Sequence, residues 1–177
     1  MNDQTYKQFL ENKNLSNYLG QELIRDSLLP DILGDDTHQI LYWAGKHLAR
    51  QYTLTSIDKL PIFFEQFGLG TLSKIKDNGQ KITWMLSGEL IKKRIGLIDS
   101  PDFFLEAGFI SETCQITSRF DCESEIEKIN KNKATVEIIT YITKTPVQTD
   151  EGASYFVLDE TTEIPQEEIV DEEVTKK

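Results

Sequence analysis

The segment SPDFFLEAGFISETCQITS, residues 100–118, carries the clearest helix signal in the chain. Ser100 is a favoured N-cap residue, Pro101 suits the first helical position, and Asp102 places an acid in the first turn. We therefore predict a helix from about Pro101 to Ser118. Its apolar residues form two stripes, made of Phe103, Phe104, Ala107, Ile110 and Cys114 on one side and Leu105, Phe109 and Ile116 on the other. A helix of this kind packs against neighbours on two sides.

Glu106 lies between the two stripes and is the carboxylate that we expect to be partly buried. A buried carboxylate needs a cationic partner, so a salt bridge to Arg50 or Arg94 is predicted. No second acid is spaced to form a general acid/base pair with Glu106, so a structural role is favoured over a catalytic one.

Upstream of this segment, the spacing of apolar residues predicts a helix that starts near Leu19 and stops at Pro30, which cannot continue a helix. A second helix is predicted from Asp36, which forms a capping-box pattern with Gln39, to about Tyr52.

On the second helix, small residues such as Gly45 should permit a close helix crossing, whereas Lys46 and Arg50 should lie on the polar side. A third helix should begin near Ile57 and end at Gly68.

The pattern in the second half of the sequence predicts two antiparallel hairpins. The first joins a strand starting at Leu72 to residues 82–86 through the turn Asp77-Asn78-Gly79. The second joins residues 123–131 to residues 134–143. Residues 89–95 fit either a helix or a strand. The expected fold class is α+β, with helices packed on a twisted antiparallel sheet of about four strands.

The negative charge is concentrated near the end of the sequence. The 177 residues carry a formal net charge of −11, but residues 146–177 hold ten acids and two lysines. We expect one α+β domain over residues 1–158 and an acidic, disordered tail over residues 159–177. The apolar residues 155–158 should form an edge strand or dock on the body. The basic run Lys92-Lys93-Arg94 should be a solvated surface or bind the tail.

Composition also narrows the classes of partner. The acidity argues against nucleic acid, and no run approaches the roughly 18 apolar residues of a membrane span. Only Cys114 and Cys122 are present, which suits neither a disulfide framework nor a zinc site. We expect a cytosolic protein without a cofactor or metal. His38 and His47 should lie on opposite faces of their helix, so they cannot share a metal ion.

Aromatic residues suggest where a ligand could bind. Phe63 and Phe64 face one side of the third predicted helix, which indicates either a core or a pocket wall. The hypothetical ligand pocket consists of Trp43, His47, Phe63, Phe64, Phe103 and Phe109. No residues are assigned as catalytic.

Three segments, residues 29–34, 40–50 and 105–110, resemble the YslB-like proteins, a bacterial family of unknown function. That family in turn resembles the 4-vinyl reductase-type domains, the TRAPP vesicle-tethering subunits and the haem-binding nitric-oxide sensors. The resemblance implies the α+β fold already predicted. Pro101 and Gly108 match the 4-vinyl reductase-type pattern, but Phe103 stands where that pattern has a cysteine. Neither histidine matches an axial haem ligand.

The residues by themselves do not reveal a reaction. The leading hypothesis is a non-enzymatic module that forms a homodimer, binds a protein partner, or encloses a small hydrophobic ligand. The alternatives are an enzyme of small-molecule metabolism and a haem or small-molecule sensor. No nucleophile elbow, phosphate loop or paired-acid motif is present to favour the enzyme.

Overall fold

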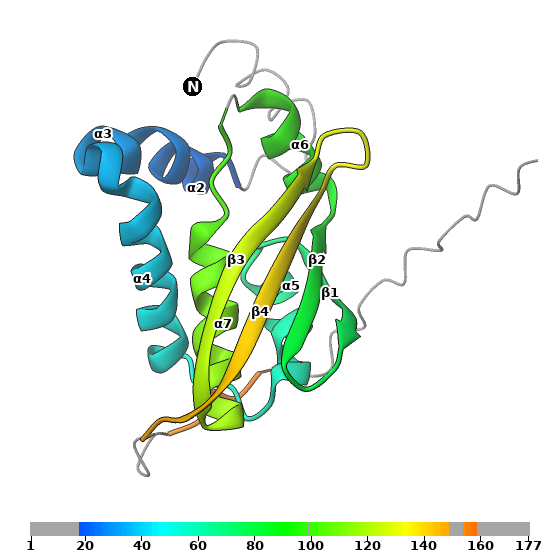
Figure 1. The fold of residues 1–177 in the computed structure, drawn as a ribbon. Coiled ribbons are helices and arrows are strands. Elements are labelled where there is room, and N and C mark those ends of the chain that lie inside the picture. Colours follow the sequence, from blue (N-terminus) through cyan, green and yellow to red (C-terminus); the bar gives the residue numbers. More distant parts are fainter. Residues whose placement is uncertain (1–17, 99, 149–153, 159–177) are drawn as a thin grey trace, which may run out of the picture.

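The computed structural model describes residues 18–98, 100–148 and 154–158. In this part of the chain the strands form one twisted antiparallel sheet in the order β1-β2-β4-β3 (Figure 1). Its strands are β1 Thr71–Asp77, β2 Lys81–Ser87, β3 Phe120–Asn130 and β4 Thr135–Pro146. Helix α7 (Phe104–Ser118) lies against one face of the sheet, and α4 (Thr37–Gln51) packs on α7. The predicted fold class is confirmed.

Both predicted hairpins are present. The turn after β1 is closed by Asp77 Oδ1, which accepts a hydrogen bond from the Gly79 backbone N–H at 2.9 Å. Gly79 has a φ of +81°, a conformation that favours glycine. Alternate residues of the two central strands point into the core and are at most 1% exposed: Ile82, Trp84, Leu86, Val136, Ile138 and Thr140. The core is therefore built on the face of the sheet that α7 covers.

Helix α7 begins at Phe104, three residues later than predicted. The prediction of Ser100 as the N-cap residue is wrong. Asp102 supplies the hydrogen bond at this end of the helix, because its Oδ1 accepts from the Phe104 backbone N–H at 2.7 Å. Every residue from Glu106 to Cys114 is buried, as a helix packed on two sides requires. The Asp102 carboxylate, at the N-terminal end of α7, also interacts favourably with the helix dipole.

Helices α4 and α7 cross in backbone contact, which confirms the expectation for Gly45. A Cβ atom on Gly45 would lie 2.1 Å from the Leu105 carbonyl oxygen, and one on Gly108 would lie 2.0 Å from the Tyr42 carbonyl oxygen. Only glycine at both positions allows the two helices to approach this closely.

The polar side predicted for α4 is wrong at Lys46, which is only 3% exposed. Its amine reaches the β3 edge, where it pairs with Glu123. Trp43 instead faces outward. The capping box is also not formed, because the Asp36 side chain makes no capping hydrogen bond. Thr37 Oγ1 donates to the Gly34 carbonyl at 2.5 Å at this end of the helix.

The first helical segment runs past Pro30, contrary to the prediction. It consists of α2 (Leu19–Leu23), a π-helical turn η2 (Ile24–Leu28) and α3 (Leu29–Leu33). Pro30 lies in the first turn of α3, after the wider π turn, where its ring and missing N–H are tolerated. The segment ends at Gly34, whose φ is +62°.

The remaining elements are short. The third helix comprises a 3₁₀ turn η4 (Ile57–Lys59) and α5 (Leu60–Gln66), and residues 89–95 belong to helix α6 (Glu89–Leu97). Residues 154–158 dock on the body without forming a strand: the Phe156 N–H donates to the Thr53 carbonyl at 2.8 Å. The predicted tail, residues 159–177, lies outside the described residues.

The glycine crossing generates a stability prediction. Gly45→Ala should lower the free energy of unfolding by about 3 kcal/mol or more, because the new methyl group meets backbone atoms that cannot move aside. Gly96→Ala in α6 is the matched control, since nothing lies within 4 Å of its Cβ position. The control should be neutral or stabilising by about 1 kcal/mol. Urea unfolding measures both, and equal stabilities for the two variants would contradict the crossing.

Candidate functional site

The structure does not bring the six predicted pocket residues together. Four of them, Phe63, Phe64, Phe103 and Phe109, lie in the hydrophobic core and are at most 3% exposed. Phe63 and Phe109 stack with their ring centroids 4.3 Å apart. Phe63 and Phe64 of α5 pack on Phe109 of α7, and Phe103 lies under the Arg94 guanidinium. All four therefore belong to the packed core, which was the other interpretation of the aromatic pattern.

The other two predicted residues lie on the outer side of α4. His47 is exposed, and its Nε2 lies 3.1 Å from the Gln51 side-chain nitrogen. Trp43 is 60% exposed, although it is a large apolar side chain. Of the six residues, Trp43 alone lines the surface groove that follows.

This surface groove, called the aromatic groove below, lies between the first half of α4, the start of α7 and the edge strand β3. Its volume is about 350 Å³, and its lining residues are His38, Gln39, Tyr42, Trp43, Phe104, Glu123 and Ser124. The rings of Tyr42 and Trp43 meet edge to face with centroids 6.2 Å apart. The groove thus presents aromatic surface to solvent beside a few polar groups.

A connected set of polar bonds holds the β3 side of the groove. Lys46 Nζ lies 2.9 Å from Glu123 Oε1 and donates to the Cys122 carbonyl at 3.3 Å. Tyr42 donates its hydroxyl hydrogen to the other oxygen of Glu123 and accepts from the Ser124 N–H at 3.0 Å. Burial and the hydrogen bond to Glu123 raise the pKa of Tyr42 to about 12, so this hydroxyl stays protonated.

The opposite side of the groove is built on Asp102. His38 Nδ1 lies 2.5 Å from Asp102 Oδ2, while Oδ1 of the same carboxylate caps α7 through Phe104. The His38 and Phe104 rings pack with centroids 5.1 Å apart. One carboxylate therefore fixes two walls of the groove. Sequence reasoning missed this pair because residues 38 and 102 meet only through the helix crossing.

A second polar feature, called the buried ion cluster below, joins three helices. Its members are Glu22 and Arg25 of the first helical segment, Asp26 beside them, Arg94 of α6 and Glu106 of α7. Arg94 pairs with Glu22 and Asp26 at 3.0 Å each and with Glu106 at 3.7 Å, and Arg25 pairs with Glu106. Glu22, Arg25 and Asp26 occupy the inner face of the segment, whereas most of its aliphatic side chains are exposed.

The cluster settles the expectations for Glu106 and the basic run. Glu106 is buried and pairs with Arg94, as one of the two predicted alternatives stated. Arg50 instead bonds to Glu112, with Nε 2.7 Å from Oε1. Arg94 is 1% exposed, so it is not part of a solvated basic surface. The partner Arg25 was not predicted from the sequence.

The aromatic groove and the buried ion cluster meet at one residue. The Asp102 carbonyl accepts hydrogen bonds from Arg25 at 3.0 Å and from Arg94 at 2.9 Å, while its side chain holds His38. The charges in the cluster do not balance, because three carboxylates face two guanidinium groups. Burial, with a further contribution from the neighbouring Asp26 carboxyl, raises the pKa of Glu22 to about 8. A proton on Glu22 compensates the excess negative charge.

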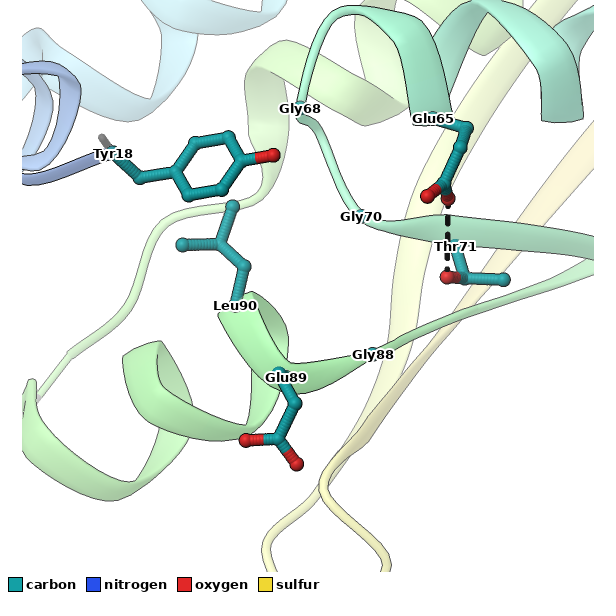
Figure 2. Close-up of a pocket in the computed structure, with 8 residues that line it drawn as sticks. All are labelled: Tyr18, Glu65, Gly68, Gly70, Thr71, Gly88, Glu89 and Leu90. Carbon is teal, nitrogen blue, oxygen red and sulfur yellow. Dashed lines mark hydrogen bonds between the residues drawn. The ribbon is translucent and has the colours of Figure 1, made fainter. Parts of the chain in front are cut away.

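A smaller pocket of about 180 Å³ lies at the start of α2, between the α5–β1 and β2–α6 connections. Figure 2 shows the ring of Tyr18 between Leu90 and the loop that contains Gly68 and Gly70. A Cβ atom on Gly68 would lie 2.3 Å from Tyr18 Cε1. Opposite Tyr18, Thr71 donates to Glu65 at 3.4 Å. The Tyr18 ring, packed on Gly68, therefore forms one wall of this pocket.

The described residues contain no group of three or more His, Cys, Asp or Glu side chains arranged to hold a metal ion. Within the same residues, no helix combines the length and the apolar character needed to cross a membrane. Cys114 and Cys122 are both buried and free.

Fold and site together define an α+β domain whose helices cover one face of a four-stranded antiparallel sheet and which carries an aromatic surface groove. The chain belongs to the DUF2507 family, described as a protein of unknown function, whose pattern matches residues 18–141. It is 39% identical over 131 residues to the uncharacterized protein YslB of Bacillus subtilis (strain 168), which covers 74% of this chain and 88% of that protein. The resemblance to the YslB-like family is confirmed.

The solved structures that resemble this chain are much more distant in sequence. The phenol-responsive sensory domain of the transcription activator PoxR, crystallised with phenol, has a TM-score of 0.54 at 10% identity, over 70% of this chain and 73% of that one. A trafficking protein particle complex subunit 3 from Naegleria fowleri, covalently bound to palmitic acid, has a TM-score of 0.41 at 13% identity, over 75% of this chain and 93% of that one. The PoxR likeness supports the α+β fold.

The buried ion cluster predicts how stability changes with pH. Folded Glu22 keeps its proton up to a pKa of about 8, whereas its ordinary pKa is 4.5. Between these values the folded state binds more protons than the unfolded state, so stability falls as pH rises through this window. Glu22→Gln, which mimics the protonated carboxyl, should reduce that slope.

Thermal unfolding across this pH window measures the effect. Glu89→Gln is the control, because Glu89 is exposed and pairs only with Lys92 at 3.6 Å among the described residues. The control should keep the wild-type slope. An unchanged slope in Glu22→Gln would show that Glu22 does not carry the extra proton.

Proposed function

We propose that this protein is a cytosolic, non-enzymatic binding module that takes a small apolar ligand in the aromatic groove and acts as a homodimer. The observation that carries the proposal is the groove itself: Trp43 is 60% exposed beside Tyr42 and Phe104 around a volume of about 350 Å³. Leaving an indole in water forfeits the free energy of burying it, so an exposed indole in a concave site suits a ligand.

The rigidity of the groove supports binding. Tyr42 and Lys46 are both bonded to Glu123, and His38 is bonded to Asp102. Side chains held in this way lose little conformational freedom when a ligand enters, which favours affinity. The fold also supports the proposal, because the PoxR domain of similar fold is described as phenol-responsive. Two buried free cysteines fit a reducing, cytosolic compartment.

The His38–Asp102 pair is the one observation that favours an enzyme, because an imidazole oriented by a carboxylate can act as a general base. In covalent catalysis such a base activates a side-chain nucleophile. The serine of the groove, Ser124, is 8% exposed, and its hydroxyl lies 2.7 Å from that of Thr140. This hydroxyl is committed to the β3–β4 pairing, which supports a binding role over a catalytic one.

The homodimer is proposed through the outward side of the first helical segment. Four aliphatic side chains there, called the aliphatic face, are 49–65% exposed: Leu23, Ile24, Leu28 and Ile32. A contiguous apolar face of this kind is unfavourable in water and typical of association surfaces. A second copy would present the same face, which suits a two-fold symmetric contact.

Ligand binding is tested by the indole N–H resonances in a heteronuclear NMR spectrum. The chain has two tryptophans, and Trp84 is 1% exposed and bonded to Thr140. Adding 2-naphthol or 2-methylnaphthalene should shift the Trp43 signal and leave the Trp84 signal in place. Because Trp43→Ala removes this reporter, binding to the variants is followed by the fluorescence of 2-naphthol. Trp43→Ala should weaken binding about tenfold, whereas Tyr155→Ala, which removes an equally exposed ring elsewhere, should not. No shift of Trp43 with either probe would refute the proposed site.

The dimer is tested by sedimentation equilibrium. Ile32→Glu places a charge on the aliphatic face and should convert the dimer into a monomer, because an unpaired charge is costly to bury. Ile75→Glu is the control, since Ile75 is 58% exposed on strand β1, away from that face. A wild-type protein that sediments as a monomer at high micromolar concentration would contradict the dimer.

A further inference from the structure

The polar groups around the aromatic groove differ in whether they are available to a ligand. The Tyr42 hydroxyl donates to Glu123 and accepts from the Ser124 N–H, so its hydrogen is committed. Lys46 is buried against Glu123 and the Cys122 carbonyl. The Ser124 hydroxyl is paired with Thr140 inside the sheet. These groups shape the groove and have little capacity left for a ligand.

The Glu123 carboxylate, whose side chain is 56% exposed, keeps acceptor capacity on the β3 side, and on the α4 side His38 does so. Its Nδ1 is bonded to Asp102, but among the described residues no partner contacts its Nε2, which points away from Asp102 on the far side of the ring. His38 lines the groove and its side chain is 59% exposed, so its ring is open to solvent at this wall. In the neutral imidazole, an Nδ1–H held by a carboxylate leaves Nε2 as a hydrogen-bond acceptor. Gln39 also lines the groove, but its amide can rotate to present either a donor or an acceptor, so it does not discriminate between ligands that donate and ligands that accept a hydrogen bond.

We infer that the ligand of the aromatic groove is a neutral aromatic molecule with one hydrogen-bond donor, a hydroxyl or an N–H, which His38 Nε2 accepts. This inference rests on the proposed function and names the class of ligand that the site takes. The aromatic walls of Tyr42, Trp43 and Phe104 supply the apolar contact, and His38 supplies the orientation.

The charges near the groove select against anions. The carboxylates of Asp102 and Glu123 lie on opposite sides of the groove, and the ammonium of Lys46 pairs with Glu123. The Arg25 and Arg94 guanidinium groups also lie next to Asp102, but they are paired with the carboxylates of the buried ion cluster. A carboxylate ligand would approach this net negative charge while offering no donor to His38 Nε2. The volume of about 350 Å³ suits a molecule of one or two aromatic rings.

The experiment compares three probes of matched shape: 2-naphthol, 2-methylnaphthalene and 2-naphthoate. Titrations followed by the Trp43 indole resonance give the three dissociation constants. We expect 2-naphthol to bind about fivefold to tenfold more tightly than 2-methylnaphthalene, the ratio of one net hydrogen bond. We expect 2-naphthoate to bind the most weakly. If 2-naphthol and 2-methylnaphthalene bind equally, the inference fails while the proposed function stands; if no probe binds, the proposed function fails.

Two variants on α4 assign the effect to His38. His38→Phe keeps the aromatic wall and removes the acceptor, so the preference for 2-naphthol over 2-methylnaphthalene should fall to about one. His47→Phe is the matched control, because His47 lies on the same helix, is exposed, and does not line the groove. It should retain the wild-type preference. A preference that survives in His38→Phe would overturn the inference.

A third variant separates hydrogen-bond chemistry from shape. In Asp102→Asn the side-chain oxygen can still cap Phe104, but the amide group then donates to His38 Nδ1. The imidazole proton moves to Nε2, which becomes a donor. The preference should therefore shift from 2-naphthol toward 2-naphthoate, a reversal that a loss of packing would not produce. An unchanged order of affinities in Asp102→Asn would contradict the role given to the His38–Asp102 pair.

Discussion

The backbone contact between α4 and α7 at Gly45 and Gly108 is the constraint on which the other features depend. Because no side chain separates the helices there, α4 lies close to α7, and side chains from its flanking turns extend to elements beyond the crossing. The turn on one side brings Lys46 to the β3 edge, and the turn on the other brings His38 to Asp102. The aromatic groove is the space between these two anchored ends. Its polar anchors therefore exist only because of the close crossing.

The first helical segment is held by a different kind of interaction. It is anchored by the buried ion cluster, and most of its aliphatic side chains remain in water. Burying ions costs free energy that their mutual attraction offsets only when the geometry is good, so this contact contributes specificity more than net stability. Arg25 and Arg94 both bond to the Asp102 carbonyl, which also links the segment to the start of α7 and to the groove wall.

Much of the fold could be predicted, but little of the site. Local signals located both hairpins, the crossing glycine and the two-sided helix, since these depend on neighbours in the sequence. The six predicted pocket residues share aromatic rings, and four of them form core. Sequence periodicity cannot distinguish an aromatic residue in the core from one that lines a ligand pocket. Two further aromatic residues, Tyr42 and Phe104, do line the groove. The sequence signal that could have located the groove is the spacing of His38 and Tyr42, which lie four residues apart on one face of a helix.

The sequence by itself determined the class of structure: the periods of apolar residues and the turn residues specify helices on an antiparallel sheet. It also determined the family, through the segments shared with YslB-like proteins. Only the tertiary structure decided which charges are inside. Lys46, Arg94 and Glu22 are polar at the level of sequence pattern, but each is buried because a partner from a distant element meets it. Such pairings depend on three-dimensional approach, which hydrophobic periodicity does not encode.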